Sequence, residues 1–455
     1  MLDITNPATG ALVERVETDS LVAIGEKAKR ARAAQPGWAA LPLDERTAMV
    51  RRFRDALVKR REELSRTLTT EVGKPIKQSR SELTAVVGRI DYFLAEVPQA
   101  LREEEVSSEA GLREAITREP LGVIANISAW NYPYFVGSNV FVPALLTGNA
   151  VLYKPSEFST LTGLAIADAL HDAGVPQDVF APIIGAGDVG ASLLQQPIDG
   201  VFFTGSYATG KLVAAASGAA MVRVQLELGG KDPVYVTDDV DVPKAAASLA
   251  DGAFYNTGQS CCSVERIYLH EDIHEHFADE FLKNVRSFVM GDPADERTYI
   301  GPVTRRAQLG VLDRQVADAR TKGAHVRLGG ARRAGPGNWF EPTVLTDVTH
   351  AMEVMREESF GPIIGLQAVG NDEEALRLMQ DTPYGLTAGV YSRSEARARS
   401  LLSHLSVGSA YWNACDRVSP RLPWSGRGHS GVGVTLGREG ILAMTQPKAW
   451  HLRSA

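Results

Sequence analysis

"GVIANISAW", residues 122–130, is a short apolar run that ends in polar and aromatic residues and opens a repeating pattern. Further strand-like runs follow at "NAVLYKP" (149–155), "FAPIIG" (180–185) and "GVFFTGS" (200–206). Helix-like segments lie between them at "FVGSNVFVPALLTG" (135–148), "STLTGLAIADALHDAG" (159–174) and "AGDVGASLLQQP" (186–197). Because strands that alternate with helices are typical of βαβ units, the pattern predicts an α/β fold with a parallel sheet.

A second alternating series begins near residue 228. Its predicted strands are "DPVYVTD" (232–238) and "SVERIYLHE" (263–271), and its predicted helices are "VPKAAASLADGAFYN" (242–256) and "IHEHFADEFLKNVRSF" (273–288). A chain of 455 residues is too long for one hydrophobic core. We therefore expect two α/β domains that meet near residue 228, with a ligand cleft between them.

The first hundred residues are predicted to be largely helical. Residues 44–73 carry apolar side chains near a 3.6-residue period and end at Gly73, which indicates one amphipathic helix. Residues 78–97 indicate a second.

The composition excludes several classes of protein. A net charge of −7 argues against nucleic acid or an anionic membrane as a main partner, since both bind basic surfaces. We see neither a signal peptide nor an apolar stretch long enough to span a membrane. Three cysteines make no disulfide framework and no metal-ligand spacing, so we expect a reduced, cytoplasmic protein without a metal site.

Two adjacent cysteines, Cys261 and Cys262, lie in "GQSCC" (258–262), between a predicted helix and a predicted strand. A turn there can present a nucleophile to a cleft, which requires an accessible thiol with a lowered pKa. Taken alone, the two residues fit buried packing better than catalysis.

Two further residues are candidates for catalysis. Glu227 in "LELGGK" (226–231) lies among apolar residues, where partial desolvation would raise its pKa and suit a general base, although a buried salt bridge fits equally well. Asn131 in "SAWNYPYF" (128–135) could stabilise an oxyanion, although alone it better fits a helix N-cap.

Two segments are candidates for cofactor binding. Lys154 and Glu157 in "YKPSE" (153–157) follow a predicted strand and could hold sugar hydroxyls. "FTGSYATGK" (203–211) supplies Gly205, Ser206 and Gly210 at a helix start, where backbone amides suit a pyrophosphate. A surface ion pair and an ordinary tight turn are the simpler interpretations of each segment alone.

The order of these motifs resembles the aldehyde dehydrogenase superfamily over nearly the whole chain. The resemblance rests on "WNYP", "KPSE", "FTGSYATG", "LELGGK", "FYNTGQSCC", "EESFGP", "YGLTAGVYS" and "LPWSGRGHSG". It implies a Rossmann-like cofactor-binding domain (1–101 and 121–227), an α/β catalytic domain (228–432) and a small β bridging or oligomerisation element (102–120 and 433–455). Relatives pair through such an element, so a homodimer or homotetramer is expected.

The resemblance implies oxidation of an aldehyde to the carboxylic acid with reduction of NAD(P)+. Cys261 would be the nucleophile that forms a thiohemiacetal and then a thioester. Asn131 and the backbone N–H of Cys261 would form the oxyanion hole, and Glu227 would activate the hydrolytic water.

The resemblance also implies a cofactor site and a substrate tunnel. NAD is expected, with NADP possible, because Glu157 suits a free 2′-hydroxyl and would repel a 2′-phosphate. The implied cofactor residues are Ile127, Trp130, Lys154, Glu157, Gly187, Gly190, Phe203, Gly205, Ser206, Gly210, Leu228, Gly229, Glu358 and Phe360. The implied tunnel residues are Tyr132, Val136, Asn139, Cys262, Val418 and Trp424.

The aromatic tunnel residues favour an uncharged medium-chain or aromatic aldehyde over succinic semialdehyde. Semialdehyde enzymes of the family usually offer an arginine to the distal carboxylate. Asn139 stands where some of them have it, and Arg417 or Arg421 could substitute.

Two departures concern proton transfer. Val140 stands where many relatives have a lysine, and Thr435 where they have a glutamate. Both positions can serve as proton-relay or supporting groups in relatives, so whether the relay of deacylation is altered in this chain is left open by the sequence. Two other readings remain: a CoA-acylating relative, which would lack the base that Glu227 supplies, and a catalytically weak or non-catalytic cofactor-binding protein of the same fold.

Overall fold

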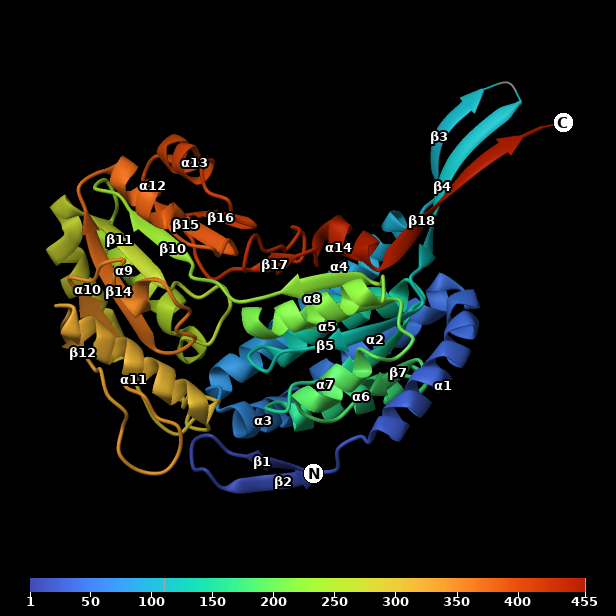
Figure 1. Cartoon of the computed structure of the whole chain (residues 1–455), viewed down its shortest axis with the longest axis horizontal. Helices are drawn as coiled ribbons and strands as arrows, with labels where there is room; N and C mark the ends of the chain where they lie inside the picture. Colours follow the sequence, from blue (N-terminus) through green and yellow to red (C-terminus); the bar gives the residue numbers. More distant parts are fainter. Residues whose placement is uncertain (110, 455) are drawn as a thin grey trace.

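The computed structural model describes residues 1–109 and 111–454. Residues 110 and 455, which fall in the ranges predicted for the bridging element, lie outside the described residues. The chain forms two α/β lobes side by side, and a narrow β-sheet projects from one of them (Figure 1). The predicted α/β class with parallel sheets is confirmed.

The first lobe is built on a six-stranded sheet in the order β17-β9-β8-β5-β6-β7. Its strands are β5 (Val123–Ile127), β6 (Ala150–Lys154), β7 (Phe180–Pro182), β8 (Gly200–Thr204), β9 (Arg223–Glu227) and β17 (Gly431–Val432). All neighbours are parallel except β17, which pairs antiparallel with β9. The four strands predicted in this region are present. Gly431 and Val432, assigned from the sequence to the 228–432 domain, instead extend this sheet.

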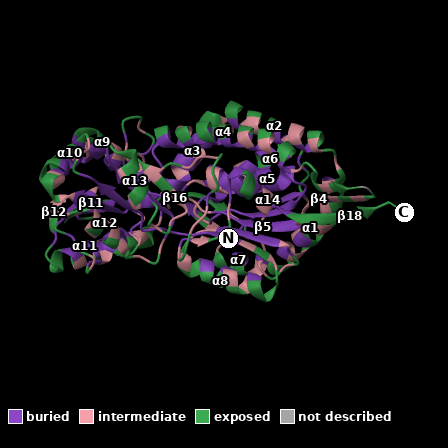
Figure 2. Ribbon diagram, turned by 90° about the horizontal axis from the view of Figure 1, so that it is seen from above, coloured by how far each residue is buried: buried purple, intermediate pink, exposed green. Residues whose placement is uncertain are grey.

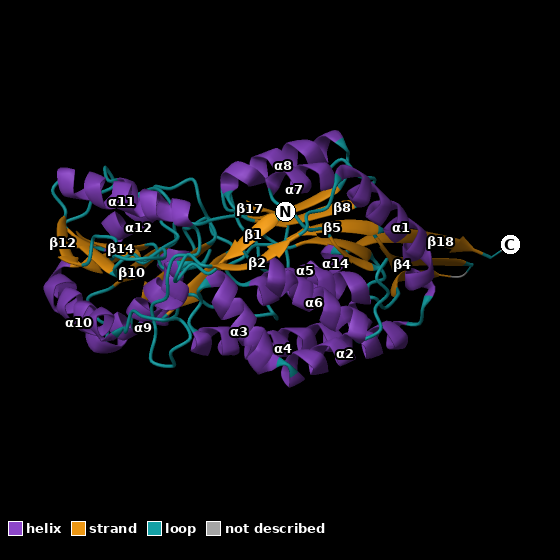
Figure 3. Cartoon of the chain, turned by 90° about the horizontal axis from the view of Figure 1, so that it is seen from below, coloured by secondary structure: helices purple, strands orange, loops and turns teal. Residues whose placement is uncertain are grey.

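Helices cover both faces of this sheet (Figure 3). They are α1 (Leu21–Ala40), α2 (Leu43–Lys59), α3 (Arg61–Val72), α4 (Ile76–Ala100), α5 (Pro133–Leu146), α6 (Thr160–Asp172), α7 (Gly187–Leu193) and α8 (Tyr207–Ala219). Side chains alternate along β5, so Ile124 packs with α2–α6 while Val123 and Ala125 pack with α1, α7 and α8. The single helix predicted over 44–73 is wrong. It is two helices, broken at Arg60, whose φ of −95° and ψ of 11° are not helical.

The second lobe is built on a seven-stranded sheet in the order β12-β13-β14-β11-β10-β15-β16. Its strands are β10 (Pro233–Val236), β11 (Arg266–His270), β12 (His325–Leu328), β13 (Thr343–Thr346), β14 (Ile363–Val369), β15 (Thr387–Tyr391) and β16 (Ser409–Trp412). Its helices are α9 (Val242–Phe254), α10 (His274–Ser287), α11 (Arg306–Thr321), α12 (Asp372–Gln380) and α13 (Glu395–Leu402). Apolar side chains pack against both faces of the sheet, and Figure 2 colours much of the interior of this lobe as buried.

The projecting sheet consists of β3 (Glu104–Glu109), β4 (Leu112–Pro120) and β18 (Thr445–Arg453), in the order β18-β4-β3. The range 433–455 is not entirely β, because α14 (Gly437–Ala443) precedes β18 and packs against α4. The largely helical N-terminal region also contains an unpredicted hairpin of β1 (Leu2–Thr5) and β2 (Leu12–Val16). None of the described helices has the length and apolarity needed to cross a membrane.

Candidate active site

The carboxyl ends of the parallel strands in the first sheet meet at one edge. Ile127, Lys154 and Glu227 are each the last residue of their strand, and Ile127 lies beside both Lys154 and Phe203 in the register. Ligands of open α/β sheets bind outside this edge. The order of the strands therefore brings together site candidates that are far apart in the sequence.

Cys261 reaches the same region from the second lobe. It follows the short 3-10 helix η1 (Tyr255–Gly258), in which Asn256 and Thr257 have positive φ angles and turn the chain sharply. Cys261 is half-buried, whereas Cys262 and Cys415 are buried. The packing expected of isolated cysteines thus applies to Cys262 and Cys415, while Cys261 is accessible.

A cavity of about 500 Å³ lies between the lobes, and both Cys261 and Glu227 line it. All of the predicted tunnel residues line it as well, namely Tyr132, Val136, Asn139, Cys262, Val418 and Trp424. An apolar-walled cavity with a few convergent polar groups is the usual form of a small-molecule site.

Glu227 is buried in this cavity, with 7% of its surface exposed. Burial raises the pKa of the carboxyl to about 7, while hydrogen bonds from Thr435 and Gln225 and the charge of Arg89 oppose the shift. Within the described residues it forms no ion pair, so the buried salt bridge left open by the sequence is not what holds it. A carboxyl with a pKa near 7 is suited to accept a proton at neutral pH.

Asn131 does not cap a helix. The N-cap of α5 is Tyr132, and the Asn131 amide instead donates a hydrogen bond to the backbone oxygen of Gln259 at 3.1 Å. Asn256 donates to the backbone oxygen of Asn131 at 3.2 Å and to that of Gln259 at 3.0 Å. These bonds tie Asn131 to the loop that carries Cys261, and the second N–H of its amide is available for an oxyanion.

The thiol of Cys262, unlike that of Cys261, is hydrogen-bonded to Asp416. Its thiol donates to Oδ1 of Asp416 at 3.1 Å, and Ser260 donates to the same oxygen at 3.0 Å. The hydrogen bond with Cys261 and burial raise the pKa of the Cys262 thiol, so it stays protonated at neutral pH. Cys262 is therefore poorly suited to be a nucleophile.

The residues predicted to hold the dinucleotide lie around the edge of the first sheet. Ser206 caps α8, its hydroxyl accepting a hydrogen bond from Thr209 N–H at 3.3 Å. The N–H groups of a first helical turn have no partner inside the helix and suit an anion. Lys154 is buried, and its Nζ donates to the Pro155 carbonyl at 3.2 Å, which leaves further N–H donors for ribose hydroxyls.

Two of the predicted glycines, Gly205 and Gly210, lie where an added Cβ would clash with a neighbouring side chain, whereas Gly187 and Gly190 have space for one. A Cβ on Gly190 would lie 3.4 Å from Cε of Lys154, one on Gly210 would lie 2.5 Å from Leu228, and one on Gly205 would lie 2.5 Å from Phe203. Gly187 begins α7 and has open space at its Cβ position. Glu157 lies close to Ser156, whose hydroxyl donates to it at 3.4 Å. These features fit a dinucleotide on the sheet edge.

The second lobe contributes Glu358 and Phe360. Glu358 accepts a hydrogen bond from Gly230 N–H at 3.1 Å, and burial raises its pKa to about 8. A Cβ on Gly229 would lie 2.4 Å from both of its carboxylate oxygens. Phe360 packs edge-to-face on Trp130 with ring centroids 5.5 Å apart.

Sequence reasoning missed three charged residues of the cavity: Glu82, Arg89 and Asp416. Glu82 and Arg89 come from α4, which the sequence showed only as an amphipathic helix. Charged residues among the buried positions of that helix were the signal that could have revealed them.

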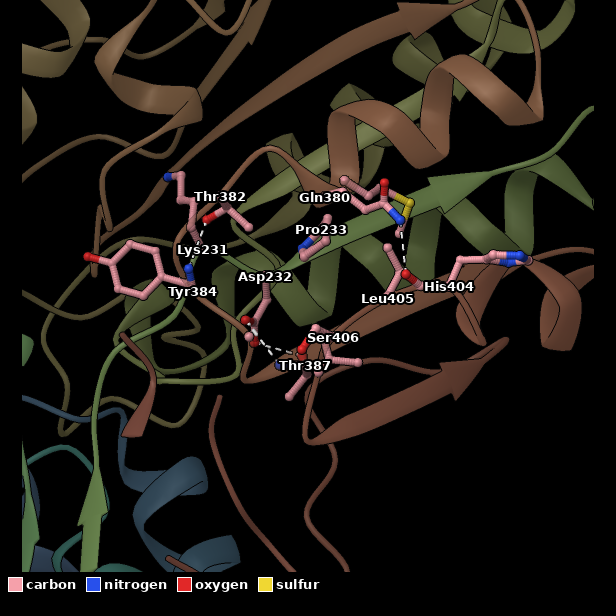
Figure 4. A pocket seen from close by; sticks show the side chains of 13 residues that line it. Lys231, Asp232, Pro233, Gln380, Thr382, Tyr384, Thr387, His404, Leu405 and Ser406 are labelled. Carbon is pink, nitrogen blue, oxygen red and sulfur yellow. Dashed lines mark hydrogen bonds between the residues drawn. The ribbon is translucent and has the colours of Figure 1, made fainter. Parts of the chain in front are cut away.

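A second cavity, of about 240 Å³, lies in the second lobe away from these residues (Figure 4). Lys231 and Asp232 line it, but both are already partnered. Lys231 pairs with Glu265 at 2.6 Å, and Asp232 accepts a hydrogen bond from the Thr387 hydroxyl at 2.6 Å. These polar groups hold the strands of the lobe together.

Comparison with known proteins identifies a family and relatives that are similar to the chain over nearly its whole length. A sequence profile of the aldehyde dehydrogenase family matches residues 1–450. The chain is 34% identical to a betaine aldehyde dehydrogenase of Brucella anthropi, over 98% of this chain and 92% of the relative.

Solved structures share the fold of the chain. An NAD-dependent aldehyde dehydrogenase from Sinorhizobium meliloti superposes with a TM-score of 0.96 at 32% identity, covering 99% of this chain and 91% of the other. An NADP-dependent enzyme from E. coli superposes with a TM-score of 0.97 at 29% identity, covering 100% and 95%.

Proposed function

This chain belongs to the aldehyde dehydrogenase family and is an NAD(P)-dependent aldehyde dehydrogenase, and we propose that Cys261, Glu227 and Asn131 carry its reaction. The observation that supports these roles most strongly is that Cys261 and Glu227, from different lobes, line one cavity. Cys261 is the accessible thiol of the pair, whereas Cys262 is engaged with Asp416.

In the first half of the reaction, the Cys261 thiolate attacks the aldehyde carbon. The negative charge that develops on the aldehyde oxygen is stabilised by the Asn131 amide and the backbone N–H of Cys261. When bound, the nicotinamide cofactor supplies the acceptor for the hydride. Loss of that hydride from the carbon leaves a thioester on Cys261.

In the second half, Glu227 takes a proton from a water molecule. The hydroxide attacks the thioester carbon, the carbon–sulfur bond breaks, and the carboxylic acid leaves with Cys261 restored as thiolate. A pKa of about 7 lets Glu227 hold this proton and then release it near neutral pH. The hydrogen bonds from Thr435 and Gln225 keep part of the population ionised.

For the cofactor we propose NAD as the preferred form. Lys154 is the last residue of β6 and Glu157 follows the strand, close enough for their charges to interact. A carboxylate suits the two hydroxyls of an adenosine ribose and repels a 2′-phosphate. The other residues proposed for this site are Ile127, Trp130, Gly187, Gly190, Phe203, Gly205, Ser206, Gly210, Leu228, Gly229, Glu358 and Phe360.

The domain division, oligomeric state and compartment are also proposals. The ranges 1–101 with 121–227, and 228–432, match the two sheets apart from Gly431 and Val432. The projecting sheet exposes β18, with Trp450 and Leu452 uncovered, which supports pairing between subunits in a homodimer or homotetramer. Three unpaired cysteines support a reducing, cytoplasmic environment.

The proposed hydrolytic reaction is tested by following NADH or NADPH absorbance with a panel of aldehydes, with and without coenzyme A. We expect turnover without coenzyme A. Turnover only in its presence would indicate a CoA-acylating enzyme. Cofactor binding without any turnover would indicate a non-catalytic protein and would contradict the proposed roles.

A further inference from the structure

A buried cation lines the substrate cavity. Arg89 on α4 is 7% exposed and lies in the same cavity as Cys261. Its Nη1 donates to Oδ1 of Asn139 at 2.9 Å, and its Nη2 donates to the Val418 carbonyl at 3.3 Å. Both acceptors are neutral, and within residues 1–109 and 111–454 the guanidinium forms no ion pair with a carboxylate.

The plane of the guanidinium is held by aromatic rings. Its carbon lies 4.1 Å from the centre of the Phe135 ring. Phe135 in turn stacks on Tyr132, with centroids 5.8 Å apart and an angle of 12° between the rings. On Tyr132 the Nζ of Lys74 lies 3.8 Å from the ring centre. Arg89 is thus oriented by stacking and by two hydrogen bonds before any ligand arrives.

The carboxylates of the cavity are already engaged by other groups. Glu82 pairs with Lys74, Asp416 accepts hydrogen bonds from Ser260 and Cys262, and Glu227 accepts them from Thr435 and Gln225. The other guanidinium groups of the lining, on Arg417 and Arg421, are on exposed residues. Among the described residues of the lining, Arg89 is therefore the buried cation that has no ion-pair partner.

A buried guanidinium without an anion is unfavourable, because its charge has left water without an equivalent partner. Burial lowers the pKa of Arg89 to about 10, so the group still carries its charge at neutral pH. Of the five N–H donors of an arginine, two are used by Asn139 and Val418. The remaining donors suit a carboxylate, which binds arginine with two parallel hydrogen bonds.

Building on the proposed roles of Cys261 and Glu227, we propose that Arg89 binds a carboxylate at the far end of the substrate, so that the enzyme oxidises aldehyde acids in preference to neutral aldehydes. The sequence favoured an uncharged substrate because two tunnel residues are aromatic and position 139, where some semialdehyde enzymes have an arginine, is an asparagine. In the structure Asn139 has a different role, because its side-chain oxygen accepts a hydrogen bond from the guanidinium of Arg89 in the cavity wall.

A purely supporting role makes a different prediction. The charge of Arg89 also lowers the pKa of Glu227. If that were its only function, loss of Arg89 would slow the oxidation of acidic and neutral aldehydes by the same factor. Assays at about pH 9, above the pKa of Glu227 and below that of Arg89, reduce this contribution.

The test measures the ratio of kcat/KM for an aldehyde acid to kcat/KM for the neutral aldehyde of the same length. The two pairs are 4-oxobutanoate with butanal and 5-oxopentanoate with pentanal. The ratio is measured in the wild type and in Arg89→Gln, Arg89→Lys and Arg80→Gln. Arg80 lies on the same helix and makes only surface ion pairs, so it is the matched control. In the wild type we expect at least one acid to exceed its neutral partner by about tenfold or more. Arg89→Gln should reduce that ratio by about 10- to 100-fold, mainly through KM, with partial recovery in Arg89→Lys. Arg80→Gln should keep the wild-type ratio. An unchanged ratio in Arg89→Gln would overturn the proposal.

A second measurement uses the wild type alone and decides the matter if Arg89→Gln does not fold. Butyrate should inhibit butanal oxidation competitively and more strongly than butanamide of the same length, since only butyrate carries a carboxylate that Arg89 can bind. Equal inhibition, together with equal oxidation of acid and neutral aldehydes, would refute the role of Arg89 and leave those of Cys261 and Glu227 standing. Failure to oxidise any aldehyde would instead count against the proposed catalytic residues.

Discussion

The hydroxyl of Thr435 donates a hydrogen bond to Oε1 of Glu227, the last residue of β9. Thr435 lies in the segment that follows β17, more than two hundred residues later in the chain. A donor on a carboxylate stabilises its charged form and so lowers its pKa. Thr435 therefore opposes the effect of burial, which alone would raise the pKa of Glu227 further above its usual value.

Replacement of Thr435 by valine should shift the pH dependence of the reaction. Valine keeps the shape and removes the donor, so the pKa of Glu227 should rise by about one unit or less. Because the base acts when ionised, the increase of kcat with pH should move to higher pH while the plateau stays similar. An unchanged pH profile of kcat would show that this hydrogen bond does not tune the base.

Replacement of Glu157 by glutamine should improve the use of NADP. The variant loses the charge that repels a 2′-phosphate and keeps a group able to bind hydroxyls. We expect the ratio of kcat/KM for NADP to that for NAD to rise by about tenfold. Steady-state kinetics with both cofactors and one aldehyde measure this ratio. A fall in the ratio would contradict the proposed location of the ribose.

Replacement of Gly229 by alanine should weaken cofactor binding. The new Cβ would lie 2.4 Å from both carboxylate oxygens of Glu358, so that side chain must move. We expect KM for the cofactor to rise by about tenfold, as is usual when a positioning contact is lost. Gly218→Ala, where no atom lies within 4 Å of the new Cβ, is the control and should behave as the wild type. Equal KM values in both variants would argue against a role for Glu358.

Replacement of Lys74 by methionine should destabilise the fold. Lys74 and Glu82 form a fully buried ion pair, and the variant leaves the carboxylate without its partner. Removal of one member of such a pair costs about 3–5 kcal/mol. The exposed pair of Lys244 with Asp241 gives the control, because water screens such a pair and Lys244→Met should leave the stability almost unchanged. Chemical denaturation of both variants gives the two free energies, and similar values would contradict this account.

The sequence was sufficient for four strands of the first sheet, β5 to β8, and for the six tunnel residues that line the cavity, because short apolar runs and local motifs carry that information. It could not show the break at Arg60, since the apolar period continues across the break. It also could not assign Gly431 and Val432 to the first sheet, because their pairing with β9 spans two hundred residues.

Arg89 was missed for a related reason. The 3.6-residue period of a helix shows that a charged residue lies on the buried face, but it does not show which distant residue forms a hydrogen bond with that side chain. Its contacts are Asn139, 50 residues away, and Val418, 329 residues away. Local periodicity predicts which face of a helix is buried, but only the tertiary structure shows what that face meets.

In the proposed reaction, Cys261 forms the thioester with the substrate, and Glu227 activates the water that hydrolyses this thioester. The most direct measurement is mass spectrometry of peptides from Glu227→Gln, quenched in acid after a single addition of aldehyde and cofactor. Because the variant acylates but hydrolyses slowly, we predict a burst of reduced cofactor and an acyl group on Cys261, absent in a Cys261→Ala, Glu227→Gln double variant. An acyl group on Cys262, or the absence of any adduct after a full burst, would contradict the account.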